Sequence, residues 1–568
     1  MTDGIDVLPV RAWARLAVRA LDEASEPLDR ANVFPVPDAD TGTNLVLTLR
    51  EGAAAIARTD GAADGPEAGA AFARGCLLGA RGNSGVIVAA WVRALVEAWA
   101  AGPVVALERA ARAARTAVGD PAAGTALSVA DDAARAARAA GADAPLVVLG
   151  AACAGAREAV LRSPQELGPR GRGRLDAGAQ GLRLVLGALA AACGATDPGL
   201  VRVVPDDDVP VSVADGTLEA GRRTWDGAVE EVPAVAATDR SDELEVMFTL
   251  DVPEPDEPGD AEDPAGPPDV AGAMRAALAG AGTSVAVVGG DGTWRGHVHT
   301  ADPGAALEDA VRVAKDAGGR LRDVQVQDLT QPRAGGLGVV AVTSAPGLVV
   351  ELARAGAVVL AHGRRRTPPG PSALRRALEE ARGRVVLLVA PPGTPVPDAE
   401  EPVSGARGPV VVRVETPTDA HTVSALAALA TLPHGPGGQA VDTPGTAPDL
   451  ASLTAAAEAT RDLVGAVRGA VLPTEWGSAV GVVEALVAAA APSGAEAAGS
   501  GGVVVLVHGV RADEELVARV VEHVAARDPR AEVIVLPSGR DDAVVHVGVE
   551  PPPTGPGASR ATGREGAA

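Results

Sequence analysis

The first two hundred residues constrain the fold most strongly, because they predict eight helices in succession with no strand between them. Apolar residues recur at three-to-four spacing, which is the period of a helix with one buried face. The segments are residues 10–24, 41–57, 69–78, 83–101, 104–118, 124–140, 145–161 and 178–193. Short connections that contain Gly, Pro or Asp separate them. Residues 8–200 are therefore expected to form an all-α domain, with its site in the loops at one end.

The rest of the chain predicts two α/β domains, because 568 residues are too many for one core. Residues 201–242 are polar and acidic and are expected to be a linker. Residues 243–330 mix strand and helix patterns into a small middle domain, interrupted by an acidic, Pro-rich insert at 253–269. In residues 337–550, Val-rich runs alternate with helical segments, which is typical of a buried sheet. Residues 551–568 are expected to be a disordered tail.

Charge and composition exclude several classes of partner. The net charge is −24, from 50 basic and 74 acidic residues, which argues against nucleic acid or an anionic membrane surface. Cys76, Cys153 and Cys193 lie in apolar helical contexts, so we expect buried free thiols. The chain shows no signal peptide and no apolar run of about 18 residues. We therefore expect a cytoplasmic protein without an integral membrane segment.

Residues 32–44, with the sequence NVFPVPDADTGTN, contain the first candidate site. The prolines favour an extended backbone, in which Asp38 and Asp40 point the same way, just before a helix that begins near Thr41. Paired carboxylates suit Mg²⁺, which takes hard oxygen ligands and substrate phosphates. The alternative is that Asp40 is only a helix cap and Asp38 a turn residue. The residues alone leave both open.

Three further helix starts share the same character. They read GARGNSG at residues 79–85, DPAAGT at 120–125 and LDAGAQG at 175–181. Small residues let a ligand approach the backbone, and a helix N-terminus offers free N–H groups to a phosphate. The first segment lacks the Gly-Lys-Ser/Thr ending of a Walker A loop. Each segment alone also suits a tight helix–helix turn, but four in one all-α domain predict a shared site.

Together and in this order, these segments resemble the DhaL-type nucleotide-binding domain of the dihydroxyacetone kinases. They resemble more closely the long fatty acid kinases of the FakA type, whose first motif reads NVFPVPDGDTGTN, with Gly where this chain has Ala39. The resemblance implies an eight-helix barrel whose aspartates hold two Mg²⁺ ions between the phosphates of ATP or ADP. It also implies a homodimer and a separate fatty-acid-binding protein of the DegV family as partner.

The resemblance assigns roles to residues of this sequence. Asp38 and Asp40 would be the catalytic metal ligands, with Asn32 as a further candidate ligand. The residues assigned to the nucleotide are Thr43, Asn44, Gly82, Asn83, Ser84, Gly85, Thr125, Asp176 and Gly178. Of these, Thr43, Asn44, Ser84 and Gly85 would face the phosphates.

A second candidate site is formed by His297 and His299, which share one face of a predicted strand. That geometry suits zinc, although the spacing alone favours a hydrogen-bonded surface pair, since structural zinc needs about four ligands. The segment GHVHTADPG resembles the middle domain of the fatty acid kinases, in some of which two His and a Cys bind zinc. Glu245 stands at the Cys position here. The resemblance thus implies a Zn²⁺ site of Glu245, His297 and His299.

Residues 337–550 resemble the DegV-like C-terminal region of the same family. Residues 362–369 and 389–393 depart from it, because the Asn-rich polar groups of the family are missing. The predicted function is an ATP-dependent phosphotransferase that converts a fatty acid carboxylate into an acyl phosphate. Two alternatives are a dihydroxyacetone (glycerone) kinase-like enzyme and a nucleotide-binding regulatory protein with little turnover. No dihydroxyacetone-binding domain is recognised in the chain.

Overall fold

The chain forms two compact units in a computed structural model. The N-terminal unit comprises residues 1–330 and 398–408, and the C-terminal unit residues 331–397 and 409–568. The structure describes residues 7–34, 36–59, 64–204, 210–212, 218–220, 244–253, 269–330, 336–363, 369–396, 409–430, 449–490 and 502–550. The predicted tail, most of the linker and insert, and residues 364–368 lie outside the described residues.

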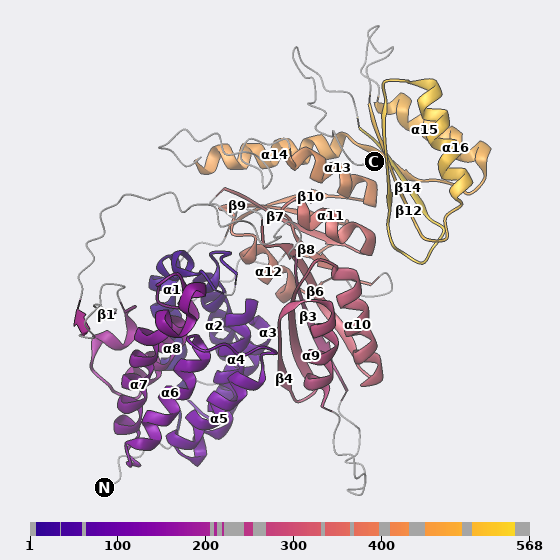
Figure 1. The fold of residues 1–568 in the computed structure, drawn as a ribbon. Coiled ribbons are helices and arrows are strands. Elements are labelled where there is room, and N and C mark those ends of the chain that lie inside the picture. The colour runs from indigo at the N-terminus through magenta and orange to yellow at the C-terminus, as the bar shows by residue number, and fades with distance from the viewer. Residues whose placement is uncertain are drawn as a thin grey trace, which may run out of the picture. The chain divides into compact units, whose positions relative to one another are not determined.

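Eight α-helices form the first part of the N-terminal unit (Figure 1). They are α1 (Val10–Ala31), α2 (Thr41–Ala57), α3 (Pro66–Gly79), α4 (Gly82–Ala98), α5 (Pro103–Thr116), α6 (Ala126–Ala139), α7 (Pro145–Leu167) and α8 (Ala177–Ala192). Each helix packs against the next, and α8 packs against α1, so that the helices close into a ring. The predicted eight-helix barrel is confirmed.

Aromatic side chains fill the centre of this barrel. Trp13 is fully buried and meets Phe72 and Trp91 edge to face, with ring centroids 5.2 and 6.3 Å apart. The Nε1 of Trp13 donates a hydrogen bond to the carbonyl oxygen of Val185, which ties α1 to α8. Apolar faces at helical spacing converge on these rings. All three cysteines are buried and free, as expected.

Helix α4 begins an apolar segment that was not expected from the sequence. Residues 82–101 are long and apolar enough to cross a membrane, so the prediction that no such run exists is wrong on length and composition. Much of this segment is buried inside the unit, including Trp91 and Leu95. One such helix is weak evidence for a span, because a core helix meets the same criteria.

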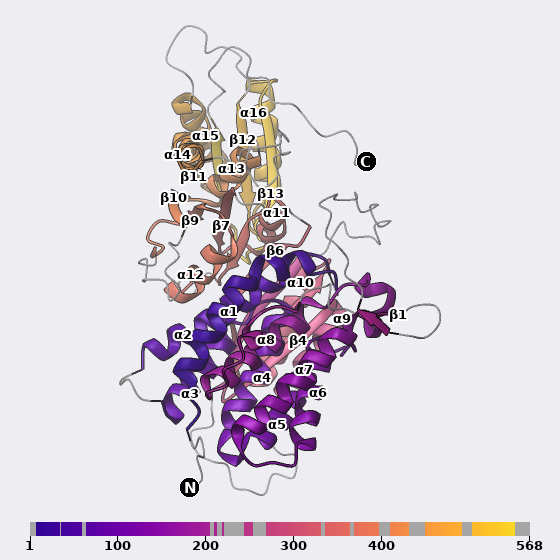
Figure 2. The same cartoon turned by 90° about the vertical axis from the view of Figure 1, so that its left-hand side faces the viewer.

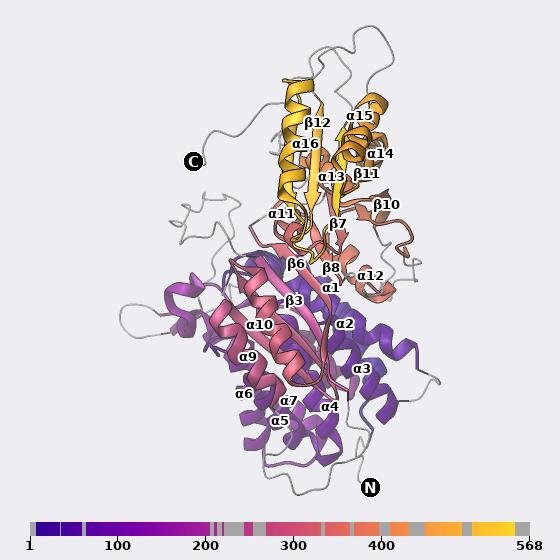
Figure 3. The same ribbon diagram turned by 90° about the vertical axis from the view of Figure 1, so that its right-hand side faces the viewer.

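The second part of the N-terminal unit is a four-stranded antiparallel sheet, here called the middle sheet. Its strands lie in the order β6 (Arg320–Asp328), β3 (Leu244–Asp251), β5 (Thr293–Thr300) and β4 (Thr283–Gly290). Helices α9 (Val270–Ala281) and α10 (Pro303–Asp316) cover one face (Figure 3). A short strand pair, β1 (Pro210–Ser212) and β2 (Leu218–Ala220), lies where only a linker was expected.

The C-terminal unit contains two further sheets. Strands β10 (Val410–Glu415), β9 (Val385–Ala390), β7 (Leu337–Thr343) and β8 (Val358–Ala361) are parallel, in that order. The other sheet has the order β11 (Arg468–Val471), β14 (Val545–Glu550), β12 (Val503–His508), β13 (Glu532–Pro537), with β14 antiparallel to both neighbours. The helices are α11 (Val349–Arg354), α12 (Pro371–Glu380), α13 (Asp419–Ala430), α14 (Leu450–Ala466), α15 (Trp476–Ala490) and α16 (Glu514–Arg527).

This architecture confirms the predicted class, a helical domain followed by α/β regions. Strand β14 and helix α15 form where neither was predicted. Helix α1 extends well beyond the predicted residue 24 and includes Pro27.

Candidate functional site

Figure 2 shows the helices of the barrel from another side. The helix starts singled out in the sequence lie close together in this barrel. At the start of α2, the Nδ2 of Asn44 lies 2.7 Å from the position that a Cβ on Gly82 would take. At the start of α8, a Cβ on Gly178 would lie 3.6 Å from Ser84 Oγ and 3.8 Å from Ala126 Cβ. The N-terminal ends of α2, α4, α6 and α8 are therefore neighbours, and their N–H groups favour an anion.

Asp38 and Asp40 flank a residue in an unusual conformation. Ala39 has a φ of 54°, in the left-handed region that favours glycine. The extended backbone expected between the two carboxylates is therefore wrong at this residue. Asp38 is half-buried and accepts a hydrogen bond from the Nδ2 of Asn32, whereas Asp40 is 4% exposed. Two carboxylates and an amide oxygen are hard donors, and this donor set fits Mg²⁺.

Asp40 occupies the N-cap position of α2, but its side chain makes no capping hydrogen bond. Asp29 of α1 takes that place: its carboxylate accepts from the backbone N–H of Thr43 at 3.0 Å and from the hydroxyl at 2.6 Å. The interpretation of Asp40 as an ordinary cap is thus wrong. The Thr43 hydroxyl proton is committed to Asp29, so it is not available to a phosphate in this arrangement.

The loop of residues 79–85, here called the glycine loop, leads into α4. Gly82 has a φ of 55°, in the left-handed region that glycine adopts readily. The Oδ1 of Asn83 is buried and has no hydrogen-bond partner among the described residues. Gly85 packs on α2, since a Cβ there would lie 2.5 Å from Thr48 Oγ1. Gly85 thus serves close helix packing, while Asn83 and Ser84 lie in the first turn of α4.

Thr125 and Asp176 act as helix caps. The Thr125 hydroxyl accepts from the backbone N–H of Leu127, and Asp176 Oδ1 accepts from that of Ala179 at 2.7 Å. Burial raises the pKa of Asp176 to about 7, although backbone hydrogen bonds from Ala179 and Gly178 oppose the shift. Both residues lie at the shared end of the barrel.

The middle sheet presents a buried polar face opposite its two helices. Alternate residues of β3 and β5 place Glu245, His297 and His299 together, all buried, with one donor atom of each within 4.8 Å of the others. They are not the hydrogen-bonded surface pair that the spacing alone favoured. Gln327 of β6 also donates to the second oxygen of Glu245. Two imidazoles and a carboxylate are a donor set that zinc accepts from proteins.

Two polar contacts fix the orientation of the His297 ring. Its Nδ1 lies 3.0 Å from the carbonyl oxygen of Ser284, which can only accept, so Nδ1 carries a proton. Its Nε2 lies 2.7 Å from Glu245 Oε1. A metal-ligating histidine commonly donates its other N–H to a carbonyl in this way.

The polar face of the sheet borders the glycine loop. Arg295, two residues before His297 and on the same face, is 3% exposed and donates from Nε to the carbonyl oxygen of Ala80 at 3.4 Å. A Cβ on Gly82 would lie 4.0 Å from Glu245 Oε1. The two candidate sites are therefore neighbours. The sequence interpretation did not single out Arg295, although its alternation with the histidines was a usable signal.

Comparison with known proteins agrees with this arrangement. Residues 35–191 match the family model of the DAK2 domain. Residues 246–334 match the family model of the middle domain of FakA-like fatty acid kinases. The chain carries a DAK2 domain followed by a fatty acid kinase-type middle domain. These matches confirm the resemblance inferred from the motifs, while the DegV-like character of the C-terminal unit stays a prediction.

Relatives extend the similarity over part of the chain. Protein YloV of Bacillus subtilis is 32% identical over 303 residues, 51% of this chain and 50% of that protein. An uncharacterized protein of Staphylococcus epidermidis is 38% identical over 124 residues, 21% of this chain and 22% of its own length. The chain thus spans half or less of the length of these curated relatives.

Solved structures of the C. freundii dihydroxyacetone kinase are also similar to part of the chain. The native form is 20% identical, with a TM-score of 0.25, over 32% of this chain and 34% of that one. A second structure is a complex with AMP-PNP and Mg²⁺. The score is too low to support an argument about this chain.

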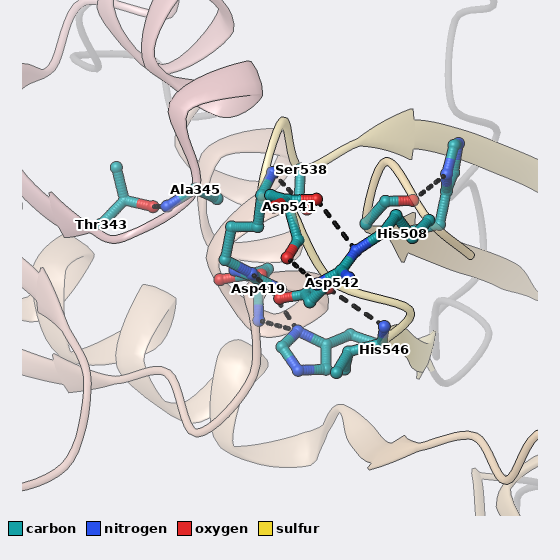
Figure 4. A network of polar contacts seen from close by, with 12 residues as sticks. Thr343, Ala345, Asp419, His508, Ser538, Asp541, Asp542 and His546 are labelled. Atoms are coloured by element: carbon teal, nitrogen blue, oxygen red, sulfur yellow. Dashed lines mark hydrogen bonds and ion pairs between the residues drawn. The ribbon is translucent and has the colours of Figure 1, made fainter. Parts of the chain in front are cut away.

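A separate polar cluster lies in the C-terminal unit, where β12 and β13 end (Figure 4). Asp419, at the start of α13, accepts from Arg540 and lies 3.0 Å from the Nδ1 of His546. Arg540 also pairs with Asp542 at 3.2 Å. Open α/β sheets often bind ligands at such strand ends. Here these charged groups are paired with one another, and the pairs connect the start of α13 to the sheet. The cluster of Asp419, Arg540, Asp542 and His546 is called the clamp below.

Proposed function

We propose that this chain is an ATP- and Mg²⁺-dependent kinase whose nucleotide binds at the shared end of the DAK2 domain. The observation that carries the proposal is the convergence of four helix N-termini beside two carboxylates, one of which occupies an N-cap position without capping its helix. Free N–H groups at such ends bind phosphates. Phosphoryl transfer depends mainly on positioning and electrostatic stabilisation, so it needs no nucleophile from the chain.

In this proposal Asp38 and Asp40, with Asn32 beside them, hold the metal. Mg²⁺, when bound, offsets the charge of the phosphates and orients them; two ions are proposed from the family resemblance. Backbone N–H groups of the glycine loop and of α2 position the phosphates. Asn44 and Ser84 lie within the same group of helix starts and complete the polar surface.

The proposed acceptor is a fatty acid carboxylate presented by a separate fatty-acid-binding protein of the DegV family. A carboxylate oxygen attacks the γ-phosphorus, the bond from that phosphorus to the bridging oxygen breaks, and ADP leaves with the electron pair. The products are an acyl phosphate and ADP. The match of the middle domain to the fatty acid kinase type supports this acceptor. A homodimer is proposed with it.

The decisive experiment measures ADP release by the purified full chain with Mg²⁺. One reaction contains a fatty-acid-binding protein loaded with fatty acid, one the same protein without lipid, and one dihydroxyacetone. Acyl phosphate only with the loaded protein supports the proposal. Turnover with dihydroxyacetone alone supports the dihydroxyacetone kinase-like alternative. Nucleotide binding with no turnover in any reaction supports a regulatory protein.

Asp38→Ala and Asp40→Ala test the metal assignment. Each change removes one of two carboxylates that would hold the ion, so we expect the Mg²⁺-dependent affinity for ATP to fall at least tenfold. Isothermal titration with and without Mg²⁺ measures this, with Asp22→Ala in α1 as the control. Wild-type affinity in both site variants would show that the carboxylates do not hold the metal.

We further propose that Glu245, His297 and His299 hold Zn²⁺. Burial lowers the pKa of His299 to about 3, although the Glu245 carboxylate opposes the shift, so the imidazole stays neutral, as metal ligation requires. The wild-type chain should retain about one zinc per chain after dialysis, measured by elemental analysis. His299→Ala should lose it. Absence of zinc from a wild-type chain purified with added Zn²⁺ would contradict the proposal.

A further inference from the structure

Arg295 is a buried cation on the polar face of the middle sheet. It lies two residues before His297 on β5 and is 3% exposed. Its Nη1 donates to the hydroxyl of Thr249, the residue directly opposite on β3, at 3.2 Å. Its Nη2 contacts the Sδ of Met247 at 3.8 Å. Side chains of the neighbouring strand therefore hold two of the three guanidinium nitrogens.

The third nitrogen of Arg295 reaches the glycine loop of the barrel. Its Nε donates to the carbonyl oxygen of Ala80 at 3.4 Å. In a planar trans peptide, the C=O of one residue and the N–H of the next point in opposite directions. A carbonyl group of Ala80 that is held toward Arg295 therefore turns the N–H of Arg81 away from the middle sheet. One side chain of the sheet thus sets the orientation of a peptide group in the glycine loop.

The start of α4 takes support from outside its own helix. The helix begins at Gly82, and the N-cap residue Arg81 makes no capping bond with its side chain. The backbone carbonyl of Arg81 accepts from the N–H of Gly85 at 2.9 Å. The first N–H groups of a helix have no partner within the helix, and they bind anions. With the carbonyl groups of Ala80 and Arg81 both held, the loop presents these N–H groups in one arrangement.

We propose that Arg295 is a positioning residue for the nucleotide, which holds the glycine loop in the arrangement that binds phosphate without contacting the phosphate itself. The inference rests on the proposed function. Arginine suits this role because its planar group presents several donors in a fixed geometry, whereas lysine carries one flexible ammonium group. Without Arg295, the carbonyl oxygen of Ala80 loses a buried charged donor, so the loop gains other arrangements and binds phosphate less tightly.

The first test titrates MgATP into the full chain by isothermal calorimetry. Arg295→Met keeps the length of the side chain without its donors, and we expect the affinity to fall about tenfold, since a buried hydrogen bond from a charged donor is lost. Arg295→Lys keeps the charge and should lose only about threefold; it decides the question if Arg295→Met does not fold.

The matched control is Arg93→Met. Arg93 of α4 pairs with Asp291, in the turn between β4 and β5, at 3.0 Å. It therefore joins the barrel to the middle sheet at another place. Its replacement loosens the same junction and should leave the affinity for MgATP unchanged.

Hydrogen exchange of the full chain without nucleotide, followed by mass spectrometry, gives a second readout. Arg295→Met should speed exchange in peptides that cover residues 79–85, and Arg93→Met should not, because only Arg295 holds a peptide group of that loop. Wild-type affinity for MgATP in Arg295→Met, with loss in Asp38→Ala, overturns the inference and leaves the proposed function standing. Equal losses in Arg295→Met and Arg93→Met also overturn it. Absence of MgATP binding in the wild-type chain instead overturns the proposed function itself.

Discussion

Ala39 lies between the two candidate metal ligands with a φ of 54°. This conformation costs a residue with a Cβ about 1 kcal/mol, whereas glycine adopts it freely. The resembled motif has glycine there. The local cost is consistent with a turn whose shape is imposed by the surrounding site.

Replacing Ala39 with glycine should therefore stabilise the chain. We expect Ala39→Gly to raise the free energy of unfolding by up to about 1 kcal/mol, because the strain is removed. Thermal denaturation followed by circular dichroism measures this. The control is Ala154→Gly, at an exposed site within α7. It should lower the free energy of unfolding by about 1 kcal/mol, because glycine loses more backbone entropy than alanine when the helix forms. A lower free energy of unfolding in Ala39→Gly than in the wild type would show that the backbone of Ala39 is not strained.

Asp176 should make stability depend on pH. Its pKa is about 7 in the folded chain, above the ordinary value of 3.8, with burial as the cause. Between about pH 4 and 7 the folded state holds a proton that the unfolded state has lost, so stability falls as pH rises through this range and is level above it. Asp176→Asn keeps a capping oxygen but does not ionise. Its melting temperature, relative to wild type, should rise by several degrees from pH 4 to 7.

Scanning calorimetry at intervals from pH 4 to 8 measures this difference. The control for removal of a carboxylate is Asp197→Asn. Asp197 lies after α8, is exposed, and accepts a hydrogen bond from the backbone N–H of Gly199. Parallel curves for wild type and Asp176→Asn over the whole range would contradict a raised pKa.

Among the elements, the crossing of α1 and α2 depends on one glycine. Gly42→Ala places a methyl group against the backbone of Ser25, so we expect it to destabilise the chain by about 2–3 kcal/mol. Gly150→Ala in α7 is the matched control. Nothing lies within 4 Å of its added methyl group, and the change should stabilise by about 0.5–1 kcal/mol. Chemical denaturation compares the two; equal effects would show that the crossing has room.

The helices could be predicted from the sequence because the spacing of their apolar residues is a local signal. The starts of α2, α4, α6 and α8 could be predicted because polar, glycine-containing segments precede them. The left-handed turn at Ala39 could not be predicted, since alanine rarely adopts it. The cap of α2 by Asp29 could not either, because it joins two helices. Strand β14 was missed because His546 and Gly548 interrupt its Val-rich pattern, and it forms by pairing with β12 and β11.

At the scale of the whole N-terminal unit, the barrel and the middle sheet are joined through the backbone. The N–H of Gly119 donates to the carbonyl of Val285, and that of Val287 donates to the carbonyl of Ala117, so residues after α5 extend the edge of the sheet at β4. Arg295 adds a contact to the glycine loop. The polar face of the sheet is thereby held beside the helix starts, which is the arrangement that two neighbouring sites require.

The last prediction concerns the C-terminal unit, whose clamp is buried. Arg540 is 6% exposed and pairs with Asp419 and Asp542. Arg540→Met leaves both carboxylates without that partner, so we expect a loss of about 3–5 kcal/mol. The exposed pair of Arg511 and Asp541 supplies the control: Arg511→Met should cost about 0.5 kcal/mol or less.

Scanning calorimetry of the full chain should place the Arg540→Met loss in one unfolding transition. Burial opposes the shift, but the bonds to His546 and Arg540 lower the pKa of Asp419. The ionised Asp419 therefore adds to the free energy of unfolding at pH values above the pKa of Asp in the unfolded chain. This contribution is lost as the pH falls through the lower pKa of the folded chain. The loss in Arg540→Met should therefore shrink in acid. The proposed binding of ATP should be unchanged, because Asp38 and Asp40 belong to the other unit. A variant that melts as wild type at neutral pH would show that the pairs contribute no net stability, as buried ion pairs sometimes do.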